Sequence, residues 1–301
     1  MDPLLRQIIA QIDLRNPVHA KKLKKNLDGA GDEYFARAAL FLNRYEKFTR
    51  GIGKNLDYGI ECYLRVVADV MHEQMRFITT GEYSSKSFED VQRRVYDNPG
   101  VMEYYMHGLM LSHFLWLHHY KVLSFFIRTL PRYRGRVSNY LEIGGGHGLY
   151  ISEALEVLSN GVSFEVLDIS ESSLAMARQF VDDRNVCFIL GDIYSFEPGK
   201  RYDFITMGEV LEHVENPLGL LVRLHDLLSN QGHLFITAPT NAPAIDHIYL
   251  FRSVEEIRGV IRAAGLEIVD EISLCAEAVS LEKAERLKLT VIYGAFLKKA
   301  S

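Results

Sequence analysis

The sequence predicts an α/β protein with a doubly wound sheet in its C-terminal half, preceded by an all-helical cap. Three observations predict this fold. Residues 1–130 carry apolar residues at helical spacing and almost no strand pattern. From Val137 onward, short β-rich runs alternate with helical runs, which indicates a parallel sheet covered by helices on both faces. The first of these strands runs into a loop of glycines and then into a helix.

The N-terminal half divides into six predicted helices. Glycine pairs near residues 29–31 and 51–53 separate some of them, and Asp97-Asn98-Pro99 is a signal for a helix start. The segment 131–135 ends the last helix, so we predict a cap over residues 1–134 and a second domain over 135–301. The predicted helices cover residues 2–13, 17–28, 32–49, 56–79, 87–97 and 100–129.

The C-terminal half ends with two successive strands, which predicts an antiparallel pair at one edge of the sheet. The predicted strands cover residues 138–143, 163–168, 186–190, 203–207, 232–238, 267–274 and 289–297. The predicted helices of this half cover residues 148–159, 171–182, 216–229 and 254–265.

Composition and charge exclude several classes of protein. With 48% hydrophobic and 24% charged residues, the chain resembles an ordinary globular protein, and it contains no apolar run of about 18 residues that could span a membrane. The N-terminus lacks the pattern of a signal peptide, and the three widely spaced cysteines fit a reducing compartment. We therefore expect a cytoplasmic protein that does not associate with membranes.

The charge is unevenly distributed along the chain. Residues 1–130 contain 18 Lys and Arg against 15 Asp and Glu, whereas residues 131–301 contain 16 against 24. An acidic C-terminal half repels a phosphate backbone, so we expect no nucleic-acid partner. The basic run at residues 21–25 could contact an anionic partner, although a solvated helix face is the favoured interpretation.

The glycine loop is the strongest motif. Glycines at 144, 145, 146 and 148 follow the strand that ends at Ile143, and they allow the chain to turn sharply with its backbone against a ligand. The spacing is G-x-G-x-G, which differs from the G-x-G-x-x-G of dinucleotide-binding loops, and Glu142 precedes it by two residues.

Two acidic residues end the next two strands. Asp168 can accept hydrogen bonds from both hydroxyls of a ribose, as the corresponding acid does in other doubly wound nucleoside sites. Asp192, after the third strand, would lie where an adenine amino group can be met, at the carboxyl edge of the sheet.

Taken together, E-x-G-x-G-x-G, the acid after strand two and Gly191-Asp192 after strand three resemble the motif series of class I S-adenosylmethionine-dependent methyltransferases. The segment Met207 to Pro217 is similar to the E-V-x-E-H segment of the small-molecule branch of that family. The resemblance covers about residues 140–240. It implies a Rossmann-like methyltransferase sheet that binds S-adenosyl-L-methionine. It also implies cofactor-binding roles for Glu142, Gly144, Gly145, Gly146, Gly148, Asp168, Ile169, Asp192, Ile193 and Glu209, with the two isoleucines on either side of the adenine.

His213 is the candidate catalytic base, because it follows strand four at the cleft and a histidine titrates near neutral pH. A packing or orienting role for His213 is the alternative. Glu209, Glu212 and His213 could also bind a divalent metal, as the similar segment does in some quinone methyltransferases, but we assign these residues to cofactor and base roles and expect no metal.

Candidate acceptor-binding residues come from two other places. His247 follows strand five in a polar loop, where it either touches the substrate or tethers the next helix. Tyr105 and His113 belong to an aromatic and histidine-rich helix directly before strand one. Such a stripe is more often core than pocket, but in the family resembled the helix at this position covers the cofactor and lines the acceptor site.

We therefore predict an enzyme that methylates an O or N atom of a small organic acceptor, with the cap forming part of the acceptor site and offering a surface for a homodimer. One alternative is a peptide or protein methyltransferase, which an open acidic groove would favour. The other is a non-catalytic homologue that only binds the cofactor.

Overall fold

The computed structural model describes residues 2–158 and 161–300. The predicted end of helix 148–159 and the outer ends of both predicted domains, residues 1 and 301, lie outside the described residues. None of the described helices is long and apolar enough to cross a membrane.

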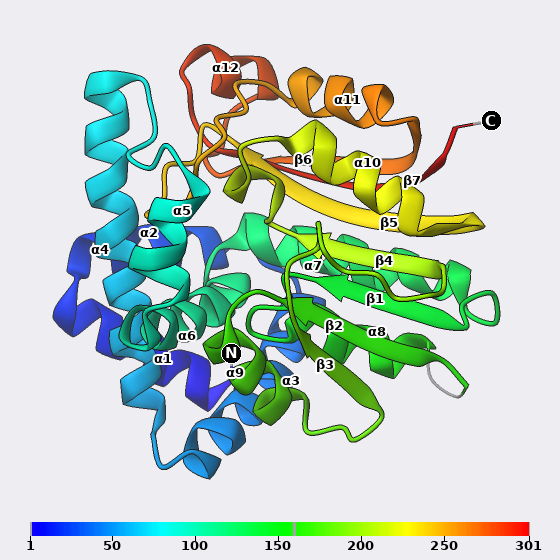
Figure 1. The fold of residues 1–301 in the computed structure, drawn as a ribbon. Coiled ribbons are helices and arrows are strands. Elements are labelled where there is room, and N and C mark those ends of the chain that lie inside the picture. The colour runs from blue at the N-terminus through cyan, green and yellow to red at the C-terminus, as the bar shows by residue number, and fades with distance from the viewer. Residues whose placement is uncertain (1, 159–160, 301) are drawn as a thin grey trace.

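A seven-stranded sheet in the order β3-β2-β1-β4-β5-β7-β6 forms the centre of the C-terminal half (Figure 1). β7 pairs antiparallel with both β5 and β6, and the other neighbours are parallel. The doubly wound fold and the antiparallel ending are therefore confirmed. The strand order reverses between β1 and β4, which is where folds of this type open a crevice at the carboxyl ends of the strands. The strands are β1 (Asn139–Ile143), β2 (Ser163–Asp168), β3 (Val186–Leu190), β4 (Tyr202–Gly208), β5 (Leu228–Thr240), β6 (Leu266–Cys275) and β7 (Val291–Lys299).

Successive residues of the central strands face opposite sides of the sheet and enter two different cores. Leu141 and Ile205 pack with leucines of α10 (Pro217–Leu227) and isoleucines of α11 (Val254–Ala263). Tyr140 and Phe204 belong to the core of the other face, with α8 (Leu149–Leu158) and α9 (Glu171–Val181). This alternation follows from the two-residue period of a strand. A six-residue helix, α12 (Leu281–Arg286), lies in the connection between β6 and β7.

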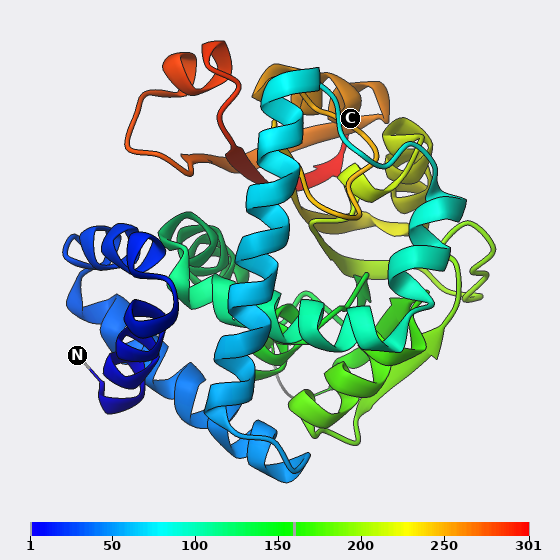
Figure 2. The ribbon, with the colours of Figure 1, turned by 90° about the vertical axis from the view of Figure 1, so that its left-hand side faces the viewer.

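The N-terminal half is helical, as predicted. It contains α1 (Pro3–Arg15), α2 (Pro17–Leu27), α3 (Asp32–Gly51), α4 (Leu56–Thr80), α5 (Phe88–Val91), a π-helical turn (Gln92–Tyr96), α6 (Pro99–Leu115), α7 (Leu117–Thr129) and a 3₁₀ turn (Leu130–Tyr133). Side chains of Asp2, Asn16, Asn55, Ser87 and Asn98 accept hydrogen bonds from the first free N–H groups of five of these helices, which explains where they begin. Figure 2 shows α4 as a long helix that runs past the α1–α3 group.

The single predicted helix over residues 100–129 is wrong, because the chain breaks at Trp116. This residue has an extended backbone (φ −103°, ψ 111°) and separates α6 from α7. Its indole N–H donates to the hydroxyl of Tyr63 on α4 at 2.8 Å. The break lets α6 lie against the glycine loop while α7 turns onto the sheet, where the ring of Phe126 lies 4.9 Å from that of Phe235.

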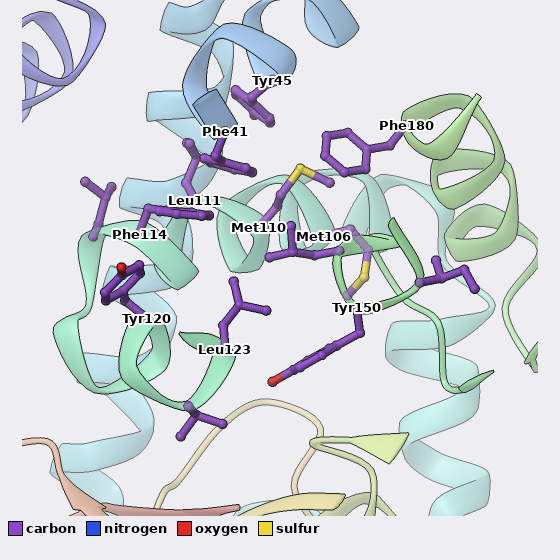
Figure 3. Packing of buried hydrophobic residues seen from close by; sticks show 14 of the residues in the cluster. Phe41, Tyr45, Met106, Met110, Leu111, Phe114, Tyr120, Leu123, Tyr150 and Phe180 are labelled. Atoms are coloured by element: carbon purple, nitrogen blue, oxygen red, sulfur yellow. The ribbon is translucent and has the colours of Figure 1, made fainter. Parts of the chain in front are cut away.

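One continuous core joins the cap to one face of the sheet. Phe41 of α3 stacks on Phe114 of α6 with ring centroids 4.2 Å apart, and the same cluster of buried residues reaches Leu123, Tyr150 and Phe180 (Figure 3). Each such fully buried side chain stabilises the fold by about 1.5–3 kcal/mol. The division of the chain at residue 134 stays a prediction, since α7 lies before that boundary and packs on the sheet.

Candidate functional site

A cavity of about 970 Å³ lies at the carboxyl ends of β1, β2, β4 and β5, and residues of α2, α4 and α6 complete its walls. On the side of the sheet, the cavity lies where the strand order reverses, between β1 and β4. All but one of the predicted site residues line this cavity: Glu142, Gly144, Gly145, Gly146, Asp168, Ile169, Asp192, Ile193, Glu209, His213, Tyr105, His113 and His247.

The exception is Gly148, which the structure places outside the lining of the cavity. It has a positive φ of 77°, and a Cβ there would lie 3.2 Å from Cα of Ala177 on α9. Gly148 therefore allows α8 and α9 to pack closely. Gly144 and Gly146 also have positive φ values, 64° and 48°, and these two do face the cavity. Their missing Cβ atoms leave the backbone accessible to a ligand.

Asp168 is held rigidly at the end of β2. Its Oδ2 accepts from the N–H of Gly146 at 3.0 Å, and its Oδ1 accepts from the N–H of Ser170 at 2.8 Å. Burial raises the pKa of this carboxyl, and the backbone N–H groups act in the opposite direction. A carboxylate has about four acceptor positions, so two remain for a ligand. Asp192 is more exposed, and its Oδ1 accepts from the N–H of Tyr194 at 2.9 Å.

Three acids of the site, Glu142, Glu209 and Glu212, have no Lys or Arg partner in the described part of the chain. Glu142 is 3% exposed and Glu212 is fully buried. Among the described residues, Oε1 of Glu209 and both carboxylate oxygens of Glu212 are buried with no hydrogen-bond partner. Burial raises the pKa of Glu209 to about 7 and raises the pKa values of Glu142 and Glu212 well above the usual range.

Glu209 also has a strained backbone. Its φ is 53°, a region that residues other than glycine rarely adopt, and its N–H donates to the carbonyl oxygen and the hydroxyl of Thr237 on β5. These bonds direct the strand end toward the cavity. The described lining contains seven Asp and Glu side chains and a single lysine, Lys22. Such a cavity favours a cationic ligand and repels an anionic diphosphate.

His213 lies in a 3₁₀ turn just after β4, where the cap contacts it. Its Nδ1 lies 3.1 Å from the backbone oxygen of Asp246 and 2.8 Å from the hydroxyl of Tyr96. A carbonyl oxygen can only accept, so in the neutral ring Nδ1 carries the proton and Nε2 is the basic nitrogen. Tyr105 of α6 donates to Oδ1 of Asp246 at 2.8 Å, and thereby fixes the carboxylate whose Oδ2 lies 3.5 Å from Nδ1 of His213.

A second arrangement surrounds the same histidine. Ligand atoms of Glu212, His213 and His247 lie within 4.8 Å of one another. Nδ1 of His247 donates to the carbonyl oxygen of Ala242 at 2.6 Å, and burial lowers the pKa of this histidine to about 4. His247 therefore joins Glu212 and His213, whereas the sequence had grouped Glu209 with these two residues.

The sequence did not identify Tyr96 and left Asp246 without a role. Asp246 sits beside His247 in a polar loop after β5, which was a usable signal. Tyr96 gave none, because its contact with His213 joins residues 117 positions apart and depends on how the cap packs.

Comparison with known proteins gives a consistent picture. A family model described as "Methyltransferase domain" matches residues 116–271, just over half of the chain. A malonyl-[acyl-carrier protein] O-methyltransferase of Ilyobacter polytropus is 29% identical over 97 residues, which cover 32% of this chain and 36% of that one. A ubiquinone biosynthesis O-methyltransferase of Pseudomonas aeruginosa is 29% identical over 160 residues, which cover 44% of this chain and 66% of that one. The chain thus matches between about a third and two thirds of the length of these relatives.

Solved structures show the same fold. The mitomycin 7-O-methyltransferase superposes with a TM-score of 0.54 at 14% identity, covering 77% of this chain and 68% of that chain. The N-methyltransferase NodS of Bradyrhizobium japonicum, in complex with S-adenosyl-L-homocysteine, has a TM-score of 0.51 at 15% identity and covers 72% of this chain and all of that chain.

Proposed function

The chain belongs to the methyltransferase domain family, and on that premise we propose that it transfers the methyl group of S-adenosylmethionine (AdoMet) to an O or N atom of a small organic acceptor. The observation that carries this proposal is that Glu142 and Glu209, beside the glycine loop, have no Lys, Arg or His partner within the described part of the chain. AdoMet brings a sulfonium and an ammonium, and both charges are of the sign that this cavity favours.

The residues of the site fit this cofactor. The backbone of Gly144 to Gly146 would lie against it, and the free acceptor positions of Asp168 would take the ribose hydroxyls. Asp192 would meet the adenine amino group, with Ile169 and Ile193 at the faces of the ring.

The cationic end of the cofactor would meet two other acids. Glu142 is buried, Glu209 is half-buried with its Oε1 shielded from solvent, and both line the cavity beside the glycine loop. A cation placed between them would restore their ionised forms, because an adjacent opposite charge lowers a carboxyl pKa.

His213 is the proposed general base. The bond from Nδ1 to the backbone oxygen of Asp246 fixes the tautomer in which Nε2, 3.6 Å from Oε1 of Glu212, has the lone pair that would take a proton from the acceptor. The imidazolium formed would be stabilised by the carboxylate of Asp246, whose Oδ2 lies 3.5 Å from Nδ1. Tyr105, His113 and His247 line the same cavity and are proposed to contact the acceptor.

A divalent cation is the second candidate partner of His213, because both oxygens of Glu212 are buried without a hydrogen-bond partner among the described residues. Carboxylate and imidazole together suit several such ions. We propose a reaction that needs no metal, and we therefore expect EDTA to leave turnover unchanged. Activity that is lost in EDTA and restored by magnesium or zinc would assign Glu212, His213 and His247 to a metal.

The proposal also assigns a role to each half of the chain. Residues 1–134 would cover the acceptor and offer a surface for a homodimer, and residues 135–301 would hold the cofactor. A cytoplasmic location is supported by Cys62, Cys187 and Cys275, all of which are free thiols. A small acceptor is favoured over a peptide because cap and sheet together line the cavity.

Turnover with methyl-labelled AdoMet tests this function. We expect label to pass to a member of a panel of phenols, small alcohols and amines, and to pass much more slowly in His213→Ala. Binding of AdoMet with no transfer to any small acceptor or peptide would favour the non-catalytic homologue, and transfer to peptides alone would favour the protein methyltransferase.

A further inference from the structure

Three histidines form a continuous row in the wall of the cavity, and the proposed reaction uses only one of them, His113, as an acceptor contact. His113 lies near the end of α6, His119 in the first turn of α7, and His147 in the glycine loop. The ring of His113 lies 4.9 Å from that of His147 and 5.5 Å from that of His119. All three line the cavity, and we call them the imidazole wall.

The imidazole wall is uncharged at neutral pH. Burial lowers the pKa of His113 to about 4, against the effect of its bond to Leu109. Burial also holds the pKa values of His119 and His147 well below the usual range, and for these two the neighbouring rings add to the effect. Each ring therefore carries a single N–H, and its position is decided by the hydrogen bonds on the protein side.

Those bonds determine all three tautomers. Nδ1 of His113 lies 3.0 Å from the carbonyl oxygen of Leu109, so it must donate. The hydroxyl of Ser112 donates its one proton to the same carbonyl at 2.7 Å, so Nδ1 of His119, 3.1 Å from that hydroxyl, must donate to it. The N–H of Leu149 donates to Nδ1 of His147 at 3.2 Å, so in this ring the proton is on Nε2.

Three nitrogens remain for a ligand. Nε2 of His113 and Nε2 of His119 present lone pairs, whereas Nε2 of His147 presents an N–H. Within the described residues none of the three nitrogens has a hydrogen-bond partner, and none is fully buried, so each is accessible to a ligand in the cavity that its residue lines.

We propose that the imidazole wall binds a neutral hydroxyl group of the acceptor, at a position away from the atom that is methylated; this assignment rests on the proposed function. A hydroxyl can donate to His113 or His119 and accept from His147, whereas a carboxylate only accepts and an ammonium only donates. Met106, Leu109 and Trp116 also line the cavity, so the hydroxyl would be carried by an aromatic ring or another apolar group.

The tautomers can be measured directly. In long-range ¹H–¹⁵N spectra of the full-length protein at neutral pH, we expect His113 and His119 to be protonated on Nδ1 and His147 on Nε2. Ser112→Ala should move the proton of His119 to Nε2 and leave His147 unchanged. Protonation of His113 and His119 on Nε2 in the unaltered protein would overturn the proposal, because the wall would then offer no acceptor.

Ligand selectivity is the second readout. With S-adenosylhomocysteine (AdoHcy) bound, we expect phenol to bind about three- to tenfold more tightly than anisole, which has no hydroxyl proton, and more tightly than benzoate. His119→Phe should remove the preference for phenol and leave the affinity for AdoHcy unchanged. Equal binding of phenol and anisole, or no binding of phenol, would overturn the proposal.

The same titrations show whether the imidazole wall binds the acceptor or the cofactor. If His119→Phe weakened AdoHcy and not phenol, the wall would serve the amino-acid end of the cofactor and the proposal would be wrong. If the unaltered protein did not bind AdoHcy at all, the proposed function would fail. The tautomers and the binding of phenol to the free protein would still test the wall.

Discussion

Gly145 offers a substitution whose effect follows from a single distance. A Cβ at this position would lie 2.2 Å from Cγ1 of Val166 on β2. Carbon atoms pack at about 3.5–4.0 Å, so Gly145→Ala creates an overlap of about 1.3 Å. Val166 is fully buried and cannot move aside, and Gly145 does not have a positive φ that would add backbone strain. The loop must therefore shift away from the sheet, toward the space where the cofactor would lie.

We expect this shift to weaken the binding of AdoHcy by about ten- to a hundredfold, or about 1.4–2.7 kcal/mol, which is within the usual cost of overpacking. Isothermal titration calorimetry gives the affinity, and thermal unfolding shows that the variant is folded. The double variant Gly145→Ala/Val166→Ala removes the clashing methyl group and should recover most of the loss. Affinity unchanged in Gly145→Ala, or no recovery in the double variant, would refute this account of the loop.

Three other outcomes follow from the same geometry. Asp168→Asn should weaken AdoMet binding by about 1–3 kcal/mol in calorimetry, because two charge-assisted hydrogen bonds to the ribose are lost; equal affinity would remove Asp168 from the cofactor site. His213→Ala should lower kcat by about 10²–10⁴ with AdoMet affinity nearly unchanged, and a variant that kept most of its kcat would return His213 to packing. AdoMet affinity should rise with pH through about 7, because Glu209 must lose a proton to pair with a cation and its pKa in the free protein is raised to about 7. Calorimetry in two buffers of different ionisation enthalpy should detect proton release near pH 6.5, and none would contradict this role of Glu209.

Much of the sheet and of its carboxyl edge could be predicted because the signals are local. The glycines after β1 and the acids after β2 and β3 stand at strand ends, and parallel strands bring those ends to one edge. The same rule predicted that Glu209 and His213, after β4, lie at this edge, and both line the same cavity.

The rest depends on contacts between distant parts of the chain. The break at Trp116 involves neither glycine nor proline, and its indole is held by Tyr63 on α4, which no local pattern reveals. The pairing of Tyr96 with His213 likewise exists only once the cap is folded against the sheet. For Gly148 the local signal exists but is ambiguous. A glycine that allows two helices to pack looks in sequence like one that contacts a ligand.

The central claim, that this cavity binds a cationic nucleoside cofactor, is tested most directly by titrating the full-length protein with AdoMet and with NAD⁺ in parallel at pH 7.5. We predict binding of AdoMet in a 1:1 ratio and no measurable binding of NAD⁺, since the described lining of the cavity has seven Asp and Glu side chains against one lysine and NAD⁺ carries an anionic diphosphate. Tight binding of NAD⁺, or an absence of AdoMet binding, would contradict the assignment of the glycine loop and of the buried acids around it.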